Sequence, residues 1–157
     1  MEIRLDGRVA LVTGASKGIG QAIAAEMVAA GASVMLSSRK EDGLRAAAAS
    51  ITPTGGADID VFAANAGDPE AAAACVSATV ERFGGLDILV NNAATNPYMG
   101  RMIDIDLPRY DKTYEVNLRG AFVWTQEAYH RAMAERGGCV INIASIDGIS
   151  VNRDETY

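Results

Sequence analysis

Cysteine, histidine and tryptophan are scarce in this sequence, with two, one and one among 157 residues. Cys75 and Cys139 lie far apart with no histidine near either, a spacing that fits neither a zinc site nor a disulfide framework. We therefore expect no metal, and we expect both cysteines to be buried thiols. His130 stands alone in a helical pattern, which favours a place at the surface or in an interface over a role as a ligand.

Long apolar runs and an excess of basic residues are also missing. No apolar stretch is long enough to span a bilayer, and the first residues, MEIRLDGRVALVTG, contain no signal-peptide core. The net charge is −6, which argues against general binding to nucleic acid or anionic membranes, although a local basic cluster can still bind phosphate. We expect a cytoplasmic protein with one globular domain over residues 1–157, because 49% of the residues are apolar.

Five short apolar runs recur along the chain, and helical periods separate them. The runs are apolar on both faces, which is typical of parallel strands covered on both sides, and they span 8–13, 33–38, 58–64, 86–92 and 139–145. Strands that alternate with helices in this way predict an α/β fold, a doubly wound parallel sheet with right-handed crossovers.

The helical periods carry their own signals. The first has an apolar face of Ile19, Ile23 and Met27, and the third has one at 72, 76, 80 and 83. Asp68 is expected to cap the third helix, with Pro69 at its first position. A longer helical region is expected over about 109–135, ending at the glycine pair 137–138, with a break at the asparagine in position 117.

The first strand runs directly into TGASKGIG at 13–20. Gly14, Gly18 and Gly20 fall where a strand turns into a helix, and such glycines let the backbone approach a pyrophosphate at the positive end of the helix. The spacing is G-x-x-x-G-x-G rather than the G-x-G-x-x-G of most dinucleotide-binding folds. The sequence therefore predicts a phosphate-binding turn at this point.

Four motifs together resemble the short-chain dehydrogenase/reductase family. TGASKGIG is similar to its cofactor loop, NNAA at 91–94 to its N-N-A-G, Asn117 in YEVNLRG to its helix asparagine, and Ser145 in INIASIDG to its catalytic serine. They occur in the family's order and cover essentially the whole chain. The resemblance implies a Rossmann fold and an oxidoreductase that transfers a hydride between a nicotinamide and a small alcohol or carbonyl substrate. The stretch ILVNNAATNPYMG is most similar to carbonyl- and retinol-reducing members.

The resemblance also implies catalytic roles. Ser145 would hydrogen-bond the substrate oxygen, and Asn117 would organise a water that relays the proton. The family's tyrosine, in Y-x-x-x-K, transfers that proton. Tyr157 stands twelve residues after Ser145, one position short of the usual spacing, so either Tyr157 or the residue after it is the tyrosine.

The lysine of that motif is not in this sequence. We therefore expect the chain to be the N-terminal part of a reductase, truncated after the fifth strand. A non-catalytic dinucleotide-binding module stays as the alternative.

Cofactor binding is implied for a further set of positions. Asn65 stands where the family often has an aspartate that contacts adenine, and Asn91 is implied to tie neighbouring strands together. The residues implied to bind the cofactor are Gly14, Ser16, Lys17, Gly18, Ile19, Gly20, Ser38, Arg39, Asn65, Asn92, Ala93 and Ala94.

NADP rather than NAD is predicted from charge. NAD-selective folds place an acid after the second strand, whereas this strand ends LSSRK, with Ser37 and Ser38 where the acid would be, followed by Arg39. Lys17 adds a second cation in the glycine loop. An arginine can bind a 2′-phosphate through two parallel hydrogen bonds, although all these cations could also be ordinary surface charges.

The sequence also predicts two surfaces, one for the substrate and one for contact between copies of the chain. Residues 95–108 are expected to form one wall of the substrate pocket, where Tyr98 and Met99 favour an apolar substrate. The region 118–133 has bulky residues on several faces, which predicts a homo-oligomer formed through this helix; they are Leu118, Phe122, Val123, Trp124, Tyr129 and Met133.

Overall fold

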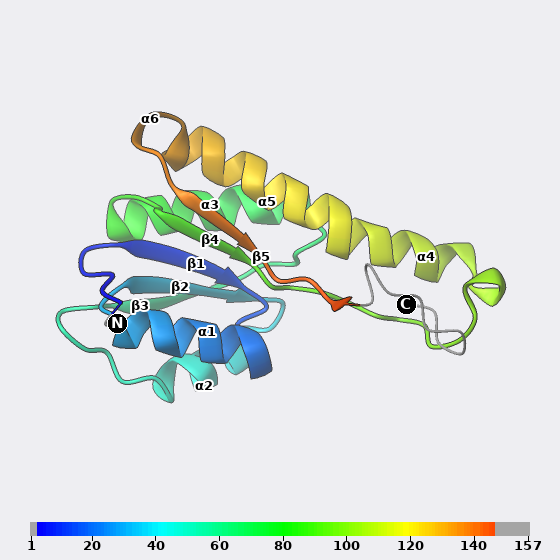
Figure 1. Cartoon of the computed structure of the whole chain (residues 1–157), viewed down its shortest axis with the longest axis horizontal. Helices are drawn as coiled ribbons and strands as arrows, with labels where there is room; N and C mark the ends of the chain where they lie inside the picture. The colour runs from blue at the N-terminus through cyan, green and yellow to red at the C-terminus, as the bar shows by residue number, and fades with distance from the viewer. Residues whose placement is uncertain (1–2, 147–157) are drawn as a thin grey trace.

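The computed structural model describes residues 3–146, which form a five-stranded parallel sheet flanked by helices (Figure 1). The strands are β1 (Val9–Thr13), β2 (Ser33–Ser38), β3 (Ile59–Ala63), β4 (Ile88–Asn91) and β5 (Cys139–Asn142). Their order across the sheet is β3-β2-β1-β4-β5, and every neighbouring pair is parallel. The doubly wound α/β fold predicted from the sequence is confirmed.

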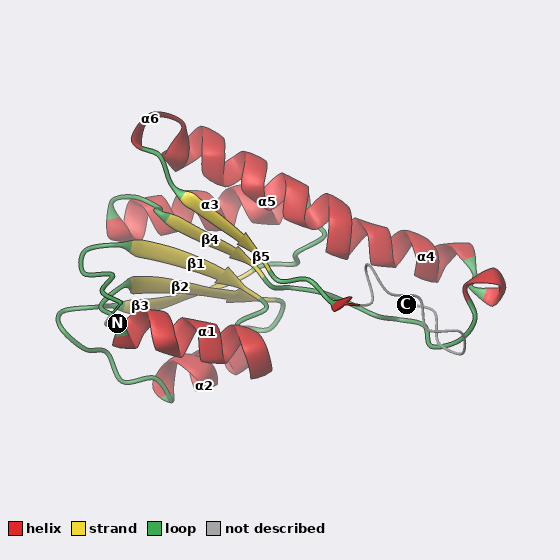
Figure 2. Cartoon of the chain, viewed as in Figure 1, coloured by secondary structure: helices red, strands yellow, loops and turns green. Residues whose placement is uncertain are grey.

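Each face of the sheet is covered by its own layer of helices (Figure 2). On one face, α1 (Gly18–Ala29) and α2 (Glu41–Ala49) pack over Ala10, Val12 and Leu36. On the other, α3 (Pro69–Phe83) and α5 (Ala121–Ala128) pack over Leu11 and Leu89. Because successive side chains of a strand point to opposite faces, both layers need apolar residues, and this explains the uninterrupted apolar runs.

The buried face of α1 is one position away from the one predicted. Gly20, Ala24 and Val28 are buried, whereas Ile19 is 65% exposed and Ile23 is only partly buried. Small residues at 20 and 24 let the helix axis approach the sheet closely. The face that is buried is therefore the one that allows this close approach, not the one with the largest side chains.

The predicted face and cap of α3 are present. Val76 is fully buried, and the Asp68 carboxylate accepts hydrogen bonds from the backbone N–H groups of Glu70 (2.9 Å) and Ala71 (3.4 Å). Pro69 occupies the first helical position. The cap signal could be predicted because it depends on residues next to one another in the chain.

A long helical stretch leads from α4 to α6, and its α4 end projects past the carboxyl ends of the strands (Figure 1). It follows a short 3-10 turn, η1 (Met102–Asp104), and comprises α4 (Leu107–Tyr114), η2 (Glu115–Gly120), α5, η3 (Tyr129–Met133) and α6 (Ala134–Arg136). Asn117 lies in η2, so the predicted break is instead a π-helical segment, a feature often found at functional sites. Gly137, with φ 74°, ends the stretch.

The two cysteines differ in environment, and the prediction that both are buried was wrong for one. Cys75 lies on α3 in the core, where burial raises its pKa to about 12. Cys139 opens β5, the edge strand of the described sheet, and is exposed. A β5 side chain has a neighbouring strand on one side only among the described residues.

We expect one thiol per chain to react with an aromatic disulfide reagent at pH 8. The thiolate is the nucleophile, and a thiol whose pKa lies near 12 supplies almost none at that pH. Absorbance of the released thiolate should reach one equivalent in the folded protein and two after denaturation. Cys139→Ser should remove the fast equivalent, and a fast reaction that survives this change would place the reactive thiol at Cys75.

Candidate functional site

A groove of about 630 Å³ opens at the carboxyl ends of β1, β2, β3 and β4. This is the edge where ligands bind in open α/β sheets. Of the positions implied to bind the cofactor, the groove is lined by Gly14, Ser16, Lys17, Ser38, Arg39, Asn65, Asn92, Ala93 and Ala94. The remaining three, Gly18, Ile19 and Gly20, lie in the first turn of α1 and are not among the lining residues.

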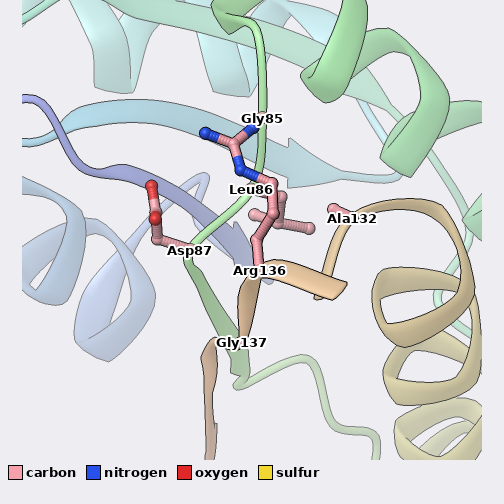
Figure 3. Close-up of a pocket in the computed structure, with 6 residues that line it drawn as sticks. All are labelled: Gly85, Leu86, Asp87, Ala132, Arg136 and Gly137. Atoms are coloured by element: carbon pink, nitrogen blue, oxygen red, sulfur yellow. The ribbon is translucent and has the colours of Figure 1, made fainter. Parts of the chain in front are cut away.

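A second, much smaller cavity of about 20 Å³ lies where the chain enters β4 and leaves α6 (Figure 3). Asp87 lines it, but its carboxylate already pairs with Arg8 (3.0 Å) and accepts from the Val9 N–H (2.9 Å). A space of this size holds about one water molecule. The groove is therefore the candidate site.

The glycine turn is shaped by two kinds of constraint. Gly14 and Gly18 have φ of 67° and 58°, a backbone region that side-chain-bearing residues rarely adopt. Gly20 is different, because a Cβ at this helical position would lie 2.5 Å from both the Gly14 carbonyl oxygen and the Asn92 side-chain nitrogen. A Cβ on Gly18 would meet no atom within 4 Å, so the turn leaves open space there for a ligand.

We expect Gly20→Ala to lower the free energy of unfolding by about 1–3 kcal/mol, because backbone and Asn92 must move to admit the methyl group. Gly43→Ala is the matched control. Gly43 is also helical and lies near the groove, but its added Cβ would sit 3.4 Å from the Ser16 Cβ, an ordinary contact. Urea unfolding monitored by circular dichroism should separate the two, and a Gly20→Ala protein as stable as the unmutated one would contradict the close approach.

Thr13 joins the two loops that frame the groove, and sequence analysis did not select it. Its hydroxyl donates to the Val90 carbonyl (3.2 Å) and accepts from the backbone N–H groups of Asn92 and Ala93, both at 3.0 Å. The Asn92 amide returns a hydrogen bond to the Thr13 carbonyl (2.9 Å). The only feature of the sequence that could have pointed to Thr13 was its place at the end of the first strand, directly before Gly14.

Asn91 ties the end of β4 to its neighbours, as the family resemblance implied. Its side-chain nitrogen donates to Thr125 Oγ1 on α5 (3.1 Å) and to Asn142 Oδ1 on β5 (2.9 Å). Its own Oδ1 is buried and has no hydrogen-bond donor within the described part of the chain. The residue holds β4, β5 and α5 together next to the groove.

Asn117 reaches the groove through the backbone of Thr95. Its Oδ1 accepts from the Thr95 N–H and its Nδ2 donates to the Thr95 carbonyl, both at 2.8 Å. Thr95 in turn lines the groove. The side-chain amide thus holds the loop after β4 in place.

Ser145 lies three residues beyond β5, on an exposed segment that follows the strand. The strand was predicted to reach 145 but ends at Asn142, although the Ile143 N–H still bonds the Asn91 carbonyl (2.9 Å). Ser145 is not among the residues that line the groove as described. Tyr157 lies outside the described residues.

Three cations gather where β2 meets α2. Lys17, Arg39 and Lys40 line the groove there with Ser38, and one acid, Asp42, lies among them. Asp42 was not singled out in the sequence, because it lies in the first turn of α2 rather than in the glycine motif. Within the described ranges no group of three or more His, Cys, Asp or Glu could hold a metal ion, and no helix there could cross a membrane.

The sequence matches the short chain dehydrogenase family over residues 8–156. This chain belongs to that family. It is 38% identical to versicolorin reductase 1 of Aspergillus parasiticus over 149 residues, which are 93% of this chain and 56% of that protein. It is 40% identical to trans-4-hydroxycyclohexanecarboxylate dehydrogenase of Sinomonas cyclohexanicum over 151 residues, 93% of this chain and 58% of that relative. The chain therefore spans little more than half of these short-chain dehydrogenases.

Solved short-chain dehydrogenases share its fold closely. One from Burkholderia cenocepacia, in complex with NADP, superposes with a TM-score of 0.86 at 36% identity, covering 96% of this chain and 60% of that one. Another from Mycobacterium marinum gives a TM-score of 0.88 at 30% identity, covering 98% and 62%.

A dinucleotide of the kind that short-chain dehydrogenases bind fits this groove. The open space above Gly18 and the helix N-terminus at that position suit a pyrophosphate. The cations beside Ser38 suit a further negative charge. These are properties of the residues present here, independent of any relative.

Proposed function

We propose that the complete protein is an NADP-dependent oxidoreductase that transfers a hydride between the nicotinamide and an alcohol or carbonyl substrate. The observation that carries the proposal is the groove at the carboxyl edge of the sheet, with its glycine turn at one end of β1 and its cations at the end of β2. The relative from Burkholderia cenocepacia, solved with NADP, supports the same cofactor class.

The cofactor choice rests on Arg39 and Lys17. Both are exposed at the rim of the groove, where their charged groups can reach a 2′-phosphate without being buried. Ser38, half-buried at the end of β2, takes the position where an NAD-selective fold has an acid. Asp42 offsets part of the positive charge, but at this end of the groove three cations, Lys17, Arg39 and Lys40, face one acid.

The proton chemistry rests on the segments after β4 and β5. Bound NADPH supplies the hydride. Ser145 donates a hydrogen bond to the substrate oxygen, and a tyrosine, either Tyr157 or the residue after it, delivers the proton. Asn117 holds the Thr95 backbone in place at the groove. Residues 95–108 form one wall of the substrate site, where Tyr98 and Met99 favour an apolar carbonyl compound.

A binding titration and a turnover assay test this function. The complete protein should bind NADPH more tightly than NADH when each is added by isothermal titration calorimetry, and it should oxidise NADPH only when an apolar ketone or aldehyde is present. Equal affinity for both cofactors would contradict the role of the cations. Tight NADPH binding with no turnover across a broad carbonyl panel would instead support a non-catalytic dinucleotide-binding protein.

A homo-oligomer is also proposed, built on one face of the long helical stretch. Exposed apolar or aromatic side chains recur at four-residue intervals there, at Tyr110, Tyr114, Leu118 and Phe122. Of the residues that suggested this interface in the sequence, Trp124 and Met133 lie in the chain's own core. The interface therefore consists of the outward residues alone, with Tyr129 at its far end.

We expect the complete protein to be a dimer or larger at micromolar concentration, and Phe122→Asp to shift it towards the monomer. A charge placed at the centre of a buried apolar interface is left without a partner. Ile3→Asp is the control, since Ile3 is 65% exposed and precedes β1, outside the long helical stretch. Multi-angle light scattering measures the mass, and a monomeric unmutated protein would reject the interface.

We also place the protein in the cytoplasm. Both cysteines are free thiols, a state that the reducing cytoplasm maintains. Cell fractionation followed by blotting for the chain is the direct measurement, and recovery in a secreted fraction would contradict this location.

A further inference from the structure

The loop between β3 and α3 is held from outside by the long helical stretch. The indole N–H of Trp124 donates to the Ala66 carbonyl at 3.1 Å, and the Arg119 guanidinium donates to the Gly67 carbonyl at 3.3 Å. Trp124 comes from α5 and Arg119 from η2, so two elements more than 50 residues further along the chain fix two successive carbonyls of this loop.

Close packing leaves this contact little freedom. A Cβ on Gly120 would lie 2.6 Å from the Ala66 carbonyl oxygen, so the helix backbone presses directly on the group that Trp124 bonds. A Cβ on Gly67 would likewise meet the Glu115 carboxylate. The Trp124 ring is 1% exposed, yet it is among the side chains that line the groove.

The same loop presents Asn65 to the groove. Asn65 is exposed and lies immediately before Ala66, while its Oδ1 accepts a hydrogen bond from the Gly67 N–H at 3.3 Å. Its carbonyl accepts from the Asp68 N–H at 3.0 Å. The backbone on either side of Asn65 is therefore fixed, on one side by β3 and on the other by the Ala66 carbonyl and the start of α3.

We propose that Trp124 is a positioning residue for the adenine end of the cofactor. Its indole N–H holds the Ala66 carbonyl, and that carbonyl sets the direction in which Asn65 and the neighbouring backbone face the groove. The inference rests on the proposed function, because it needs a dinucleotide in the groove. A tryptophan that served only as core volume would still bond its buried N–H, but phenylalanine would then replace it without a selective effect on the adenine end.

The test compares two halves of the cofactor on the complete protein. Trp124→Phe keeps an aromatic ring and removes the N–H donor. We expect its affinity for NADPH and for adenosine 2′,5′-bisphosphate to fall by the same factor, roughly three- to tenfold for one neutral hydrogen bond. Affinity for nicotinamide mononucleotide, followed by NMR titration, should not change. Asn65→Ala should reproduce the pattern, and the two changes together should cost no more than the larger one.

Thr79→Val is the matched control, since it removes a buried donor that bonds the Cys75 carbonyl (2.8 Å) within α3 and should alter neither affinity. Unchanged bisphosphate affinity in Trp124→Phe would overturn the inference, as would an equal loss for both half-cofactors, which marks a general loss of folded structure. If the unmutated protein binds neither NADPH nor the bisphosphate, the proposed function itself fails. If it binds both and Trp124→Phe binds them equally well, only the role of Trp124 fails.

Discussion

Ser145→Ala in the complete protein is expected to slow carbonyl reduction by about 10²–10³-fold, while its affinity for NADPH stays within a factor of two or so of the unmutated value. In the proposed function the hydroxyl addresses the substrate oxygen, where negative charge develops as the hydride arrives. Removing a hydrogen bond that strengthens in the transition state lowers the turnover rate rather than cofactor binding. Ser145 lies on the segment after β5 and does not line the cofactor groove, which agrees with this separation of roles.

Single-turnover oxidation of NADPH, together with a calorimetric titration, measures the two effects separately. Ser145→Thr keeps the hydroxyl and should recover part of the lost rate. Ser77→Ala, which removes a hydroxyl from α3, should change neither quantity, since Ser77 bonds Arg131 away from the groove. A Ser145→Ala protein that reduces its substrate at the unmutated rate would remove this residue from the mechanism.

Arg39→Asp is expected to reverse the cofactor preference. Losing a charge-assisted contact costs roughly 1.5–3 kcal/mol, or one to two decades in NADP affinity. The new carboxylate repels the 2′-phosphate and provides the acceptor for ribose hydroxyls that NAD-selective folds place after the second strand, so NAD affinity should rise. The effect on the ratio of the two affinities therefore exceeds the effect on either one.

Arg45→Asp is the control of equal charge change, because Arg45 lies on the exposed side of α2, where it pairs with Glu41 outside the groove. Lys17→Ala should weaken NADP binding and leave NAD binding nearly unchanged. Fluorescence titration with NADP and NAD measures both affinities for each variant. If Arg39→Asp and Arg45→Asp change the affinity ratio alike, the protein senses only its overall charge and Arg39 makes no direct contact.

Local patterns were enough to predict the strands and the start of the groove. The run at 33–38 coincides with β2, and the Asp68 and Pro69 pair starts α3 as expected. Both signals depend on neighbouring residues alone: apolar character on both faces of a strand, and a side chain that reaches the next turn of its own helix. The glycine spacing after β1 likewise marks a backbone turn whose geometry is local.

Contacts between distant segments could not be predicted in the same way. The sequence offered no measure of how closely α1 approaches the sheet, so its buried face was placed on Ile19 rather than on Gly20. Among the described residues β5 is the edge strand and Cys139 on it is exposed, and strand order is a property of the whole sheet.

For the site, the sequence predicted which residues belong to it, whereas the three-dimensional structure showed which hydrogen bonds they make. Residue type and spacing predicted Asn117 and Asn65 as members of the site, through a family resemblance that covers the chain from its first strand to Ser145. The three-dimensional fold showed that Asn117 engages the Thr95 backbone, that Thr13 joins the loops after β1 and β4, and that Trp124 holds the loop of Asn65. These bonds join residues 22 to 80 positions apart, and their partners are backbone groups that every residue carries, so no pattern of side chains along the chain can specify them.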